Sequence, residues 1–238
     1  MTNPGQSLIV LLIAGLLMAG CLRLSNPPQL SSPSTPLADL TASNYFPHST
    51  GLTAEDGASL CATLKSLEER PLFERAGKGE AYRFIWIHSF CPPVCVTFYC
   101  NQGDPVSAVL TKSQINKDYD PQKRLRTGGV THGEIAVDAS ETASLIKNFD
   151  AEKFWQIDRY DEYTRPPLYD FEVFGRRFSY DNGRCLKDGV LWIMEGYKNG
   201  QYRIVQRQSP DEDDAITKLG RMLLNQAKIY SRGEREIY

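Results

Sequence analysis

The chain has 238 residues, of which 41% are hydrophobic and 24% are charged, as is typical of one globular domain or two small ones. This composition excludes a disordered or fibrous protein. The 27 basic and 29 acidic residues give a formal net charge of −2, so we expect no basic surface and no nucleic-acid partner.

Residues 1–20 have the pattern of a signal peptide. The apolar run from Leu8 to Gly20 is shorter than the ~20 residues of a membrane span and fits the signal-peptide core of roughly 7–15 residues. Leu17-Met18-Ala19-Gly20-Cys21 resembles the lipobox of bacterial lipoproteins. The resemblance implies cleavage before Cys21, diacylation of its thiol, for example with palmitate, and acylation of the new amine. Plain secretion and an uncleaved anchor are the alternatives.

The residues after Cys21 predict where the protein resides. Leu22 stands where Asp would favour the inner membrane under the enterobacterial sorting rule, so we expect the periplasmic face of the outer membrane in a Gram-negative envelope. Residues 21–44 are rich in Pro and Ser and predict a tether. Residues 45–238 are expected to form a single domain that is held at the membrane through Cys21.

A helix and two strands are predicted first in this domain. Thr53 can cap a helix from Ala54 to about Arg70. Its apolar stripe consists of Leu60, Leu64 and Leu67, with Cys61 beside it. Alternation predicts a strand over residues 82–90. The sequence Cys91-Pro92-Pro93 interrupts it, and residues 94–100 predict a second strand, antiparallel to the first.

Two shorter strands and a helix follow. Residues 106–112 and 133–137 have the composition of strands. Asp138 and Glu141 have the spacing of a capping box, which predicts a helix beginning there. Its apolar side is expected to consist of Ala143, Ile146 and Phe149.

A β-hairpin is the strongest local prediction. Residues 158–170 predict a loop, and residues 171–180 predict one or two strands. Residues 190–207 contain two strand-like runs joined by Asn199-Gly200, the favoured pair for a type I′ turn. This turn predicts four cross-strand pairs: Tyr197 with Tyr202, Met194 with Val205, Glu195 with Ile204, and Trp192 with Arg207.

A C-terminal helix is predicted to begin at Ser209-Pro210 and to run to about Tyr230. Its apolar stripe consists of Ile216, Leu219, Leu223, Ala227 and Tyr230. Together the elements predict an α+β fold: a single domain with an antiparallel sheet of about five to seven strands flanked by helices, and the C-terminal helix packed on the sheet.

The aromatic strand and the hairpin also carry a family resemblance. Residues 82–90, Trp192-Ile193-Met194-Glu195-Gly196, Asn199-Gly200-Gln201-Tyr202 and Ser209-Pro210 are similar to a family of uncharacterised exported bacterial lipoproteins of unknown function. The likeness covers most of residues 80–229 and implies a shared fold. It implies no catalytic residue.

Five of the six cysteines remain after Cys21 is assigned to lipid. They are Cys61, Cys91, Cys95, Cys100 and Cys185. In an oxidising compartment we expect two disulfides and one thiol. A bond between Cys91 and Cys95 across the prolines is geometrically easier than one between Cys95 and Cys100, which point to opposite faces of a strand. A bond between Cys61 and Cys185 is left open.

The alternative role for these cysteines is a metal or thiol redox module. His88, Cys91, Cys95 and Cys100 offer ligands that zinc or copper accept. Their spacing matches no zinc pattern, and alternation along a strand scatters them over two faces. Structural cysteines are therefore the preferred interpretation.

A carboxylate and an aromatic loop are the other candidates. Glu195 lies among apolar residues of the hairpin, either as an acid for a hydrolase or in an ion pair with Arg203 or another arginine on the sheet. The loop residues Tyr160, Tyr163, Arg165 and Tyr169 suit contact with a protein or glycan, or else they cover the core.

The predicted function is that of a lipid-anchored cell-envelope protein. The leading hypothesis is a non-enzymatic module that binds another envelope component, a protein or a glycan, or supports the envelope structurally. No catalytic residue, metal or cofactor is assigned. The alternatives are an envelope hydrolase that uses a carboxylate of the sheet or of the loop from Asp158, and the metal or thiol module.

Overall fold

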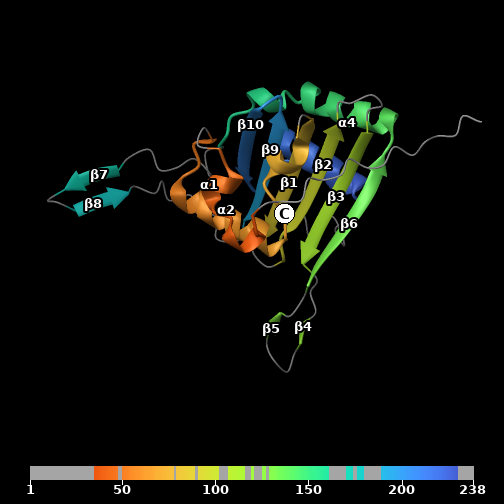
Figure 1. Cartoon of the computed structure of the whole chain (residues 1–238). Coiled ribbons are helices and arrows are strands. Elements are labelled where there is room, and N and C mark those ends of the chain that lie inside the picture. Colours follow the sequence, from red (N-terminus) through yellow and green to blue (C-terminus); the bar gives the residue numbers. More distant parts are fainter. Residues whose placement is uncertain are drawn as a thin grey trace, which may run out of the picture. The chain divides into compact units, whose positions relative to one another are not determined.

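The computed structural model describes residues 35–47, 50–77, 79–88, 91–101, 107–115, 119–120, 125–126, 129–160, 170–173, 176–179 and 189–229. Their main feature is a six-stranded antiparallel sheet in the order β10-β9-β1-β2-β3-β6 (Figure 1). The helices pack on its faces, and the last of them, α5, lies on the sheet. The fold is therefore α+β, as predicted.

The bounds of the elements are as follows. The sheet consists of β1 (Glu80–His88), β2 (Val94–Asn101), β3 (Ser107–Ile115), β6 (Val130–Val137), β9 (Val190–Lys198) and β10 (Gln201–Gln208). Two separate pairs are β4 (Tyr119–Asp120) with β5 (Leu125–Arg126), and β7 (Asp170–Val173) with β8 (Arg176–Ser179). The helices are η1 (Leu37–Asp39), α1 (Ala42–Tyr45), α2 (Ala54–Ser66), α3 (Leu72–Ala76), α4 (Ala139–Ala151), η3 (Phe154–Gln156) and α5 (Ala215–Gln226). Within the described ranges, no helix has both the length and the apolar character to cross a membrane.

Different helices cover the two faces of the sheet. On one face α4, η3 and α5 pack on an aromatic core, where Phe149 of α4 stacks on Tyr82 of β1 with ring centroids 3.6 Å apart. Gly220 brings α5 close, because a Cβ there would lie 2.7 Å from the Phe84 ring. On the other face α1 and α2, orange in Figure 1, cover a smaller aliphatic core. This second face carries the candidate site.

The folded part begins earlier than the sequence predicts. Leu40 is only 3% exposed and packs with Tyr45 and Phe46 in the core beneath α2. The predicted tether over residues 21–44 therefore overlaps the fold from residue 35 onward, because the high Pro and Ser content obscured a few apolar anchors. Residues 21–34 lie outside the described residues.

The predicted α2 helix is correct at its start and too long at its end. Thr53 Oγ1 accepts a hydrogen bond from the backbone N–H of Asp56 at 3.0 Å, and the whole predicted stripe is buried. The helix ends at Ser66 because Glu68 has a left-handed backbone with φ of 56°, after which the Glu69 N–H returns to the Leu64 carbonyl at 2.9 Å. This is the Schellman termination of a helix.

The later helices show one confirmed cap and two corrections. The Asp138–Glu141 capping box is present, but the buried side of α4 consists of Thr142, Leu145 and Phe149, and Ala143 is exposed. The prediction that Ser209 caps α5 is wrong. Ser209 Oγ instead accepts a hydrogen bond from the Val190 N–H, and Asp214 caps a helix that begins at Ala215.

The hairpin is confirmed in its register. All four predicted cross-strand pairs between β9 and β10 are present. Asn199 and Gly200 both have positive φ, 52° and 78°, as a type I′ turn requires. Glu195 is thereby placed on the face that α1 and α2 cover, opposite Ile204 on one neighbour and Arg83 on the other.

Candidate functional site

A row of polar side chains crosses the face of the sheet beneath α1 and α2. Glu195 of β9, Arg83 of β1, Thr97 of β2 and Thr111 of β3 are successive cross-strand partners. Such buried positions usually hold apolar side chains, yet the side chains of Arg83 and Glu195 are both 0% exposed. A buried charge must be paired and hydrogen-bonded. The surrounding residues provide partners for the Nε and Nη1 of Arg83 and for both oxygens of Glu195, while Arg83 Nη2 has no hydrogen bond within the described residues.

Arg83 and Glu195 form the centre of the site. The Nε of Arg83 donates to one carboxylate oxygen of Glu195, and the Tyr202 hydroxyl donates to the other. Burial by itself would lower the pKa of Arg83, but the Glu195 carboxylate outweighs it and keeps that pKa well above the ordinary value. Burial, followed by the negative charge of Glu195, raises the pKa of Tyr202. The pair is therefore ionic, with Tyr202 as a neutral donor.

The partner of Glu195 is thus another arginine of the sheet and not Arg203. Arg203 lies opposite Gly196, on the face that η3 covers, where its Nη2 donates to the carbonyl of Ile157. Alternation along β10 explains the difference, because Tyr202 and Arg203 point to opposite faces.

The segment after α2 binds to the same arginine. Arg83 Nη1 donates to the Arg70 carbonyl at 2.6 Å and lies 3.9 Å from Glu69 Oε2. Glu69 is only 3% exposed, and its own carbonyl accepts the Tyr45 hydroxyl at 2.7 Å. Arg83 therefore fastens α1 and the link between α2 and α3 to the sheet.

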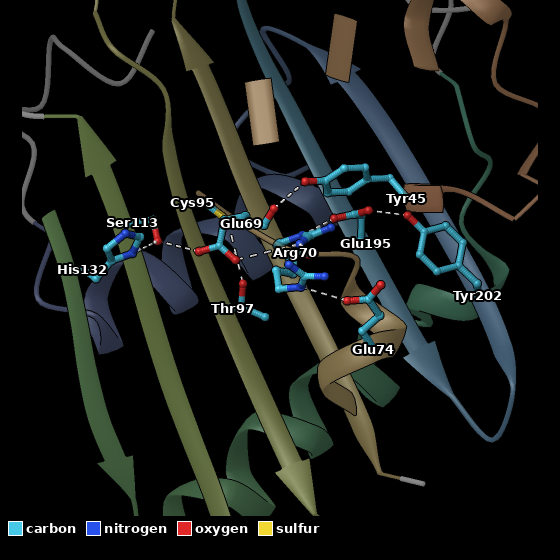
Figure 2. A network of polar contacts seen from close by, with 11 residues as sticks. Tyr45, Glu69, Arg70, Glu74, Cys95, Thr97, Ser113, His132, Glu195 and Tyr202 are labelled. Carbon is cyan, nitrogen blue, oxygen red and sulfur yellow. Dashed lines mark hydrogen bonds and ion pairs between the residues drawn. The ribbon is translucent and has the colours of Figure 1, made fainter. Parts of the chain in front are cut away.

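The network continues to β6 through Ser113 and His132 (Figure 2). The Ser113 hydroxyl donates to Glu69 Oε1 at 2.5 Å, and His132 Nδ1 lies 2.9 Å from the same hydroxyl. His132 Nε2 lies 3.0 Å from Glu68 Oε2. His132 thus lies between the Ser113 hydroxyl and the Glu68 carboxylate, with one ring nitrogen facing each.

This arrangement superficially resembles the acid, histidine and serine of a hydrolase, but its chemistry differs. A nucleophile needs a base to take its proton and a path to substrate. The Ser113 hydroxyl donates to Glu69, and Ser113 is only 1% exposed, which leaves it closed to a substrate. Glu195 is equally closed, with both oxygens bonded inside the fold. The contacts join the N-terminal helices to the sheet, which is a structural role.

The described cysteines are dispersed. Cys61, Cys95 and Cys100 have free thiols, so the favoured Cys91–Cys95 disulfide and the Cys61–Cys185 pairing are not formed. Cys95 lies beside Ile85 beneath α2, whereas Cys100 belongs to the aromatic core of the opposite face. Cys185 lies outside the described residues.

The candidate ligands of the metal or thiol alternative are not grouped in the structure. Within the part of the chain that the structure describes, no three His, Cys, Asp or Glu residues are grouped to hold a metal ion. Burial raises the pKa of the Cys95 thiol well above its ordinary value, so the thiolate needed for redox chemistry or metal binding is disfavoured. His88, Cys91, Cys95 and Cys100 are not brought together.

Of the four predicted binding residues, Tyr160 alone is described, and it contacts the fold. Its hydroxyl donates to the Gly51 carbonyl at 3.1 Å, and its backbone forms a parallel bridge with Gln206 of β10. Tyr163, Arg165 and Tyr169 lie outside the described residues, as does Cys21.

The sequence analysis did not predict most members of this polar network. One signal in the sequence could have indicated it. Arg83 lies on the same face of a core strand as Ile85 and Ile87, and a charged residue on a buried face needs a partner of opposite charge. Glu69 and Ser113 carry no such signal, because an acid after a helix and a serine in a short strand are ordinary surface residues. No protein-family model matches the chain, and no curated protein sequence matches it.

Proposed function

We propose that the protein is a lipid-anchored component of the bacterial cell envelope whose folded domain is a non-enzymatic binding or structural module. The anchor rests on Leu17–Cys21, which follows an apolar run of signal-peptide length. Attachment by more than one acyl chain is stable. In a Gram-negative cell the domain would face the periplasm from the outer membrane.

The observation that carries the non-enzymatic part of the proposal is the closure of the ionisable network. Arg83, Glu195 and Glu69 are at most 3% exposed and bind one another, the backbone or neighbouring hydroxyls. Catalysis needs groups that meet a substrate, whereas these groups join helices to strands. The network supports a rigid platform.

The binding surface we favour is the loop that follows Tyr160. Tyr160, which precedes it, donates to the Gly51 carbonyl and pairs with β10. Tyr163, Arg165 and Tyr169 supply aromatic and guanidinium groups, the side chains most enriched where proteins recognise partners. The partner class is an envelope protein or a glycan.

The lipid anchor is tested by metabolic labelling. The full chain is expressed in a Gram-negative bacterium supplied with a clickable palmitate analogue. We expect label on the wild type, loss of label and release from membranes for Cys21→Ser, and retained label for the matched control Cys61→Ser. Persistent labelling of Cys21→Ser, or an unlabelled wild type, would overturn the proposal.

The binding surface is tested by photo-crosslinking in living cells. A photoreactive amino acid replaces Tyr163 in one variant and the exposed Ser140 of α4 in its control. We expect a discrete adduct at position 163 that disappears when Arg165→Ala is added, and no adduct at position 140. Equal adducts at both positions would indicate nonspecific collisions and contradict the assignment.

A further inference from the structure

The two edges of the sheet differ in how they are covered. At β10 the segment at residues 159–160 covers the edge of the sheet. The Gln206 N–H donates to the Arg159 carbonyl at 2.8 Å, and Tyr160 forms a parallel bridge with Gln206. At β6, the opposite edge in Figure 1, no strand of the described residues pairs with the outer side. The outward N–H and C=O groups of β6 are thus available to a further strand.

The edge at β6 also lacks the usual obstacles to pairing. Residues 130–137, Val-Thr-His-Gly-Glu-Ile-Ala-Val, contain no proline and no lysine. Their pairing with β3 runs one to one from Ile115↔Val130 to Ala108↔Val137, without a bulge. Natural edge strands are commonly blocked by proline, lysine or bulges. Glu134 is the one acidic side chain on this edge that a partner strand must accommodate, and the regular edge is otherwise a template for strand addition.

We propose that β6 pairs antiparallel with β6 of a second copy of this chain, about a two-fold axis at Gly133. The two six-stranded sheets then become one continuous sheet across the dimer. The interface is isologous, since the same strand serves both copies. This inference goes beyond the lipid anchor and does not depend on it.

The charges of β6 select this register. Directly opposed residues share a face, so an axis perpendicular to the sheet passes through a residue. Only axes at Gly133 and at Glu134 keep all but one residue of β6 paired. The axis at Glu134 sets two carboxylates opposite each other, which is destabilising. The axis at Gly133 sets His132 opposite Glu134 of the second copy.

Contacts within one copy already hold the His132 ring in place for that pairing. Ser113 and Glu68 hold the ring at 2.9 and 3.0 Å. The ring is still 48% exposed and lies two residues from the exposed Glu134 on the same face. The dimer therefore gains two cross-strand pairs of His132 with Glu134, one on each side of the axis.

Disulfide trapping tests the register on the full chain in its native membrane. At the axis two opposed Cβ atoms lie about 4.5–5.5 Å apart, which is close to disulfide geometry. We expect Gly133→Cys to give a crosslinked dimer under mild oxidation. Thr131→Cys, opposite Ile135 of the second copy, is the matched control and should not exceed the wild type. Equal crosslinking at both positions, or none at 133 in folded protein, would overturn the proposal.

A charge exchange provides a second test that needs no new thiol. Two differently tagged copies of the full chain are co-expressed, and their co-purification in mild detergent is measured. Glu134→Lys alone replaces the acid opposite His132 by a cation, and His132→Glu alone places two carboxylates opposite each other, so recovery of the partner copy should fall at least tenfold. Mixing the two variants again sets an acid opposite a basic side chain on both sides of the axis and should restore recovery. Unchanged recovery with Glu134→Lys, or no rescue in the mixture, would contradict the pairing.

Discussion

Arg83 shows how one buried side chain organises a face of the sheet. Its guanidinium reaches the carboxylate of Glu195 on the neighbouring strand and the carbonyl of Arg70 beyond α2. Each contact offsets part of the cost of removing a cation from water. The Glu195 carboxylate in turn depends on Arg83 and Tyr202, and the three groups should behave as one unit.

The first prediction concerns this pair. Arg83→Met leaves Glu195 buried without its cation, which costs about 3–5 kcal/mol of unfolding free energy. Arg83→Met combined with Glu195→Met removes both charges and should lose less than Arg83→Met alone. The exposed Lys147→Met is the control, with a change within about 0.5 kcal/mol. Chemical denaturation measures all four proteins, and a double variant as unstable as Arg83→Met would refute the coupling.

The second prediction concerns pH. Burial raises the pKa values of five described tyrosines above the ordinary value of about 10: Tyr45, Tyr82, Tyr99, Tyr160 and Tyr202. The unfolded chain releases these protons near pH 10 and the folded chain does not, so their contribution to stability is complete below pH 10 and falls as the pH rises further.

Tyrosinate absorbance at pH 11 measures this difference. Adding denaturant should increase the signal as the buried hydroxyls ionise, and Tyr202→Phe should reduce the increase by one equivalent. Identical absorbance of the folded and denatured wild type at pH 11 would contradict the prediction.

At the scale of elements, local sequence patterns predicted the register of the hairpin correctly but did not predict where the helices begin and end. The Asn199-Gly200 turn alone was enough for the register of β9 and β10, because a two-residue turn leaves no freedom in pairing. The start of α5 was missed because Ser209 and Asp214 are both competent caps, and a tertiary contact of Ser209 with Val190 decides between them. Propensity does not contain that contact.

The third prediction compares two helix ends of the same design. Glu68 after α2 and Lys228 after α5 both have left-handed backbones, with φ of 56° and 54°, a conformation that favours glycine. A left-handed backbone costs a non-glycine residue about 1–2 kcal/mol, and the greater freedom of glycine in the unfolded chain offsets part of that gain, so Lys228→Gly should stabilise the protein by roughly 1 kcal/mol or less. Glu68→Gly should gain less, because it also loses the His132 contact. Thermal melts of both variants test this, and an equal gain would mean that the His132 contact contributes nothing.

At the scale of the whole domain, the polar network explains why the sheet needs its N-terminal helices. Contacts run from His132 on the edge strand β6 through Ser113, Glu69, Arg83 and Glu195 to Tyr202 on the opposite edge strand β10 (Figure 2). Sequence analysis predicted the sheet and its apolar core, because alternation is local. It could not predict the network, because its members are distant in sequence and meet only in the assembled fold.

The last prediction follows from the position of residues 35–44, which composition assigned to the tether. Leu40 packs in the core with Tyr45, and the Tyr45 hydroxyl holds the Glu69 carbonyl beside Arg83. Deleting residues 35–44 removes Leu40 and the α1 helix that positions Tyr45. Loss of a buried leucine alone costs about 2–5 kcal/mol.

For a domain of this size, a loss of about 4 kcal/mol lowers the melting temperature by roughly 8–16 °C. Deleting residues 22–31, an equally long piece of the predicted tether, is the matched control and should leave the melting temperature unchanged. Differential scanning fluorimetry of the two deletions in detergent compares them directly. Equal melting temperatures would mean that the fold starts after α1 and that the Tyr45 contact does not support the network.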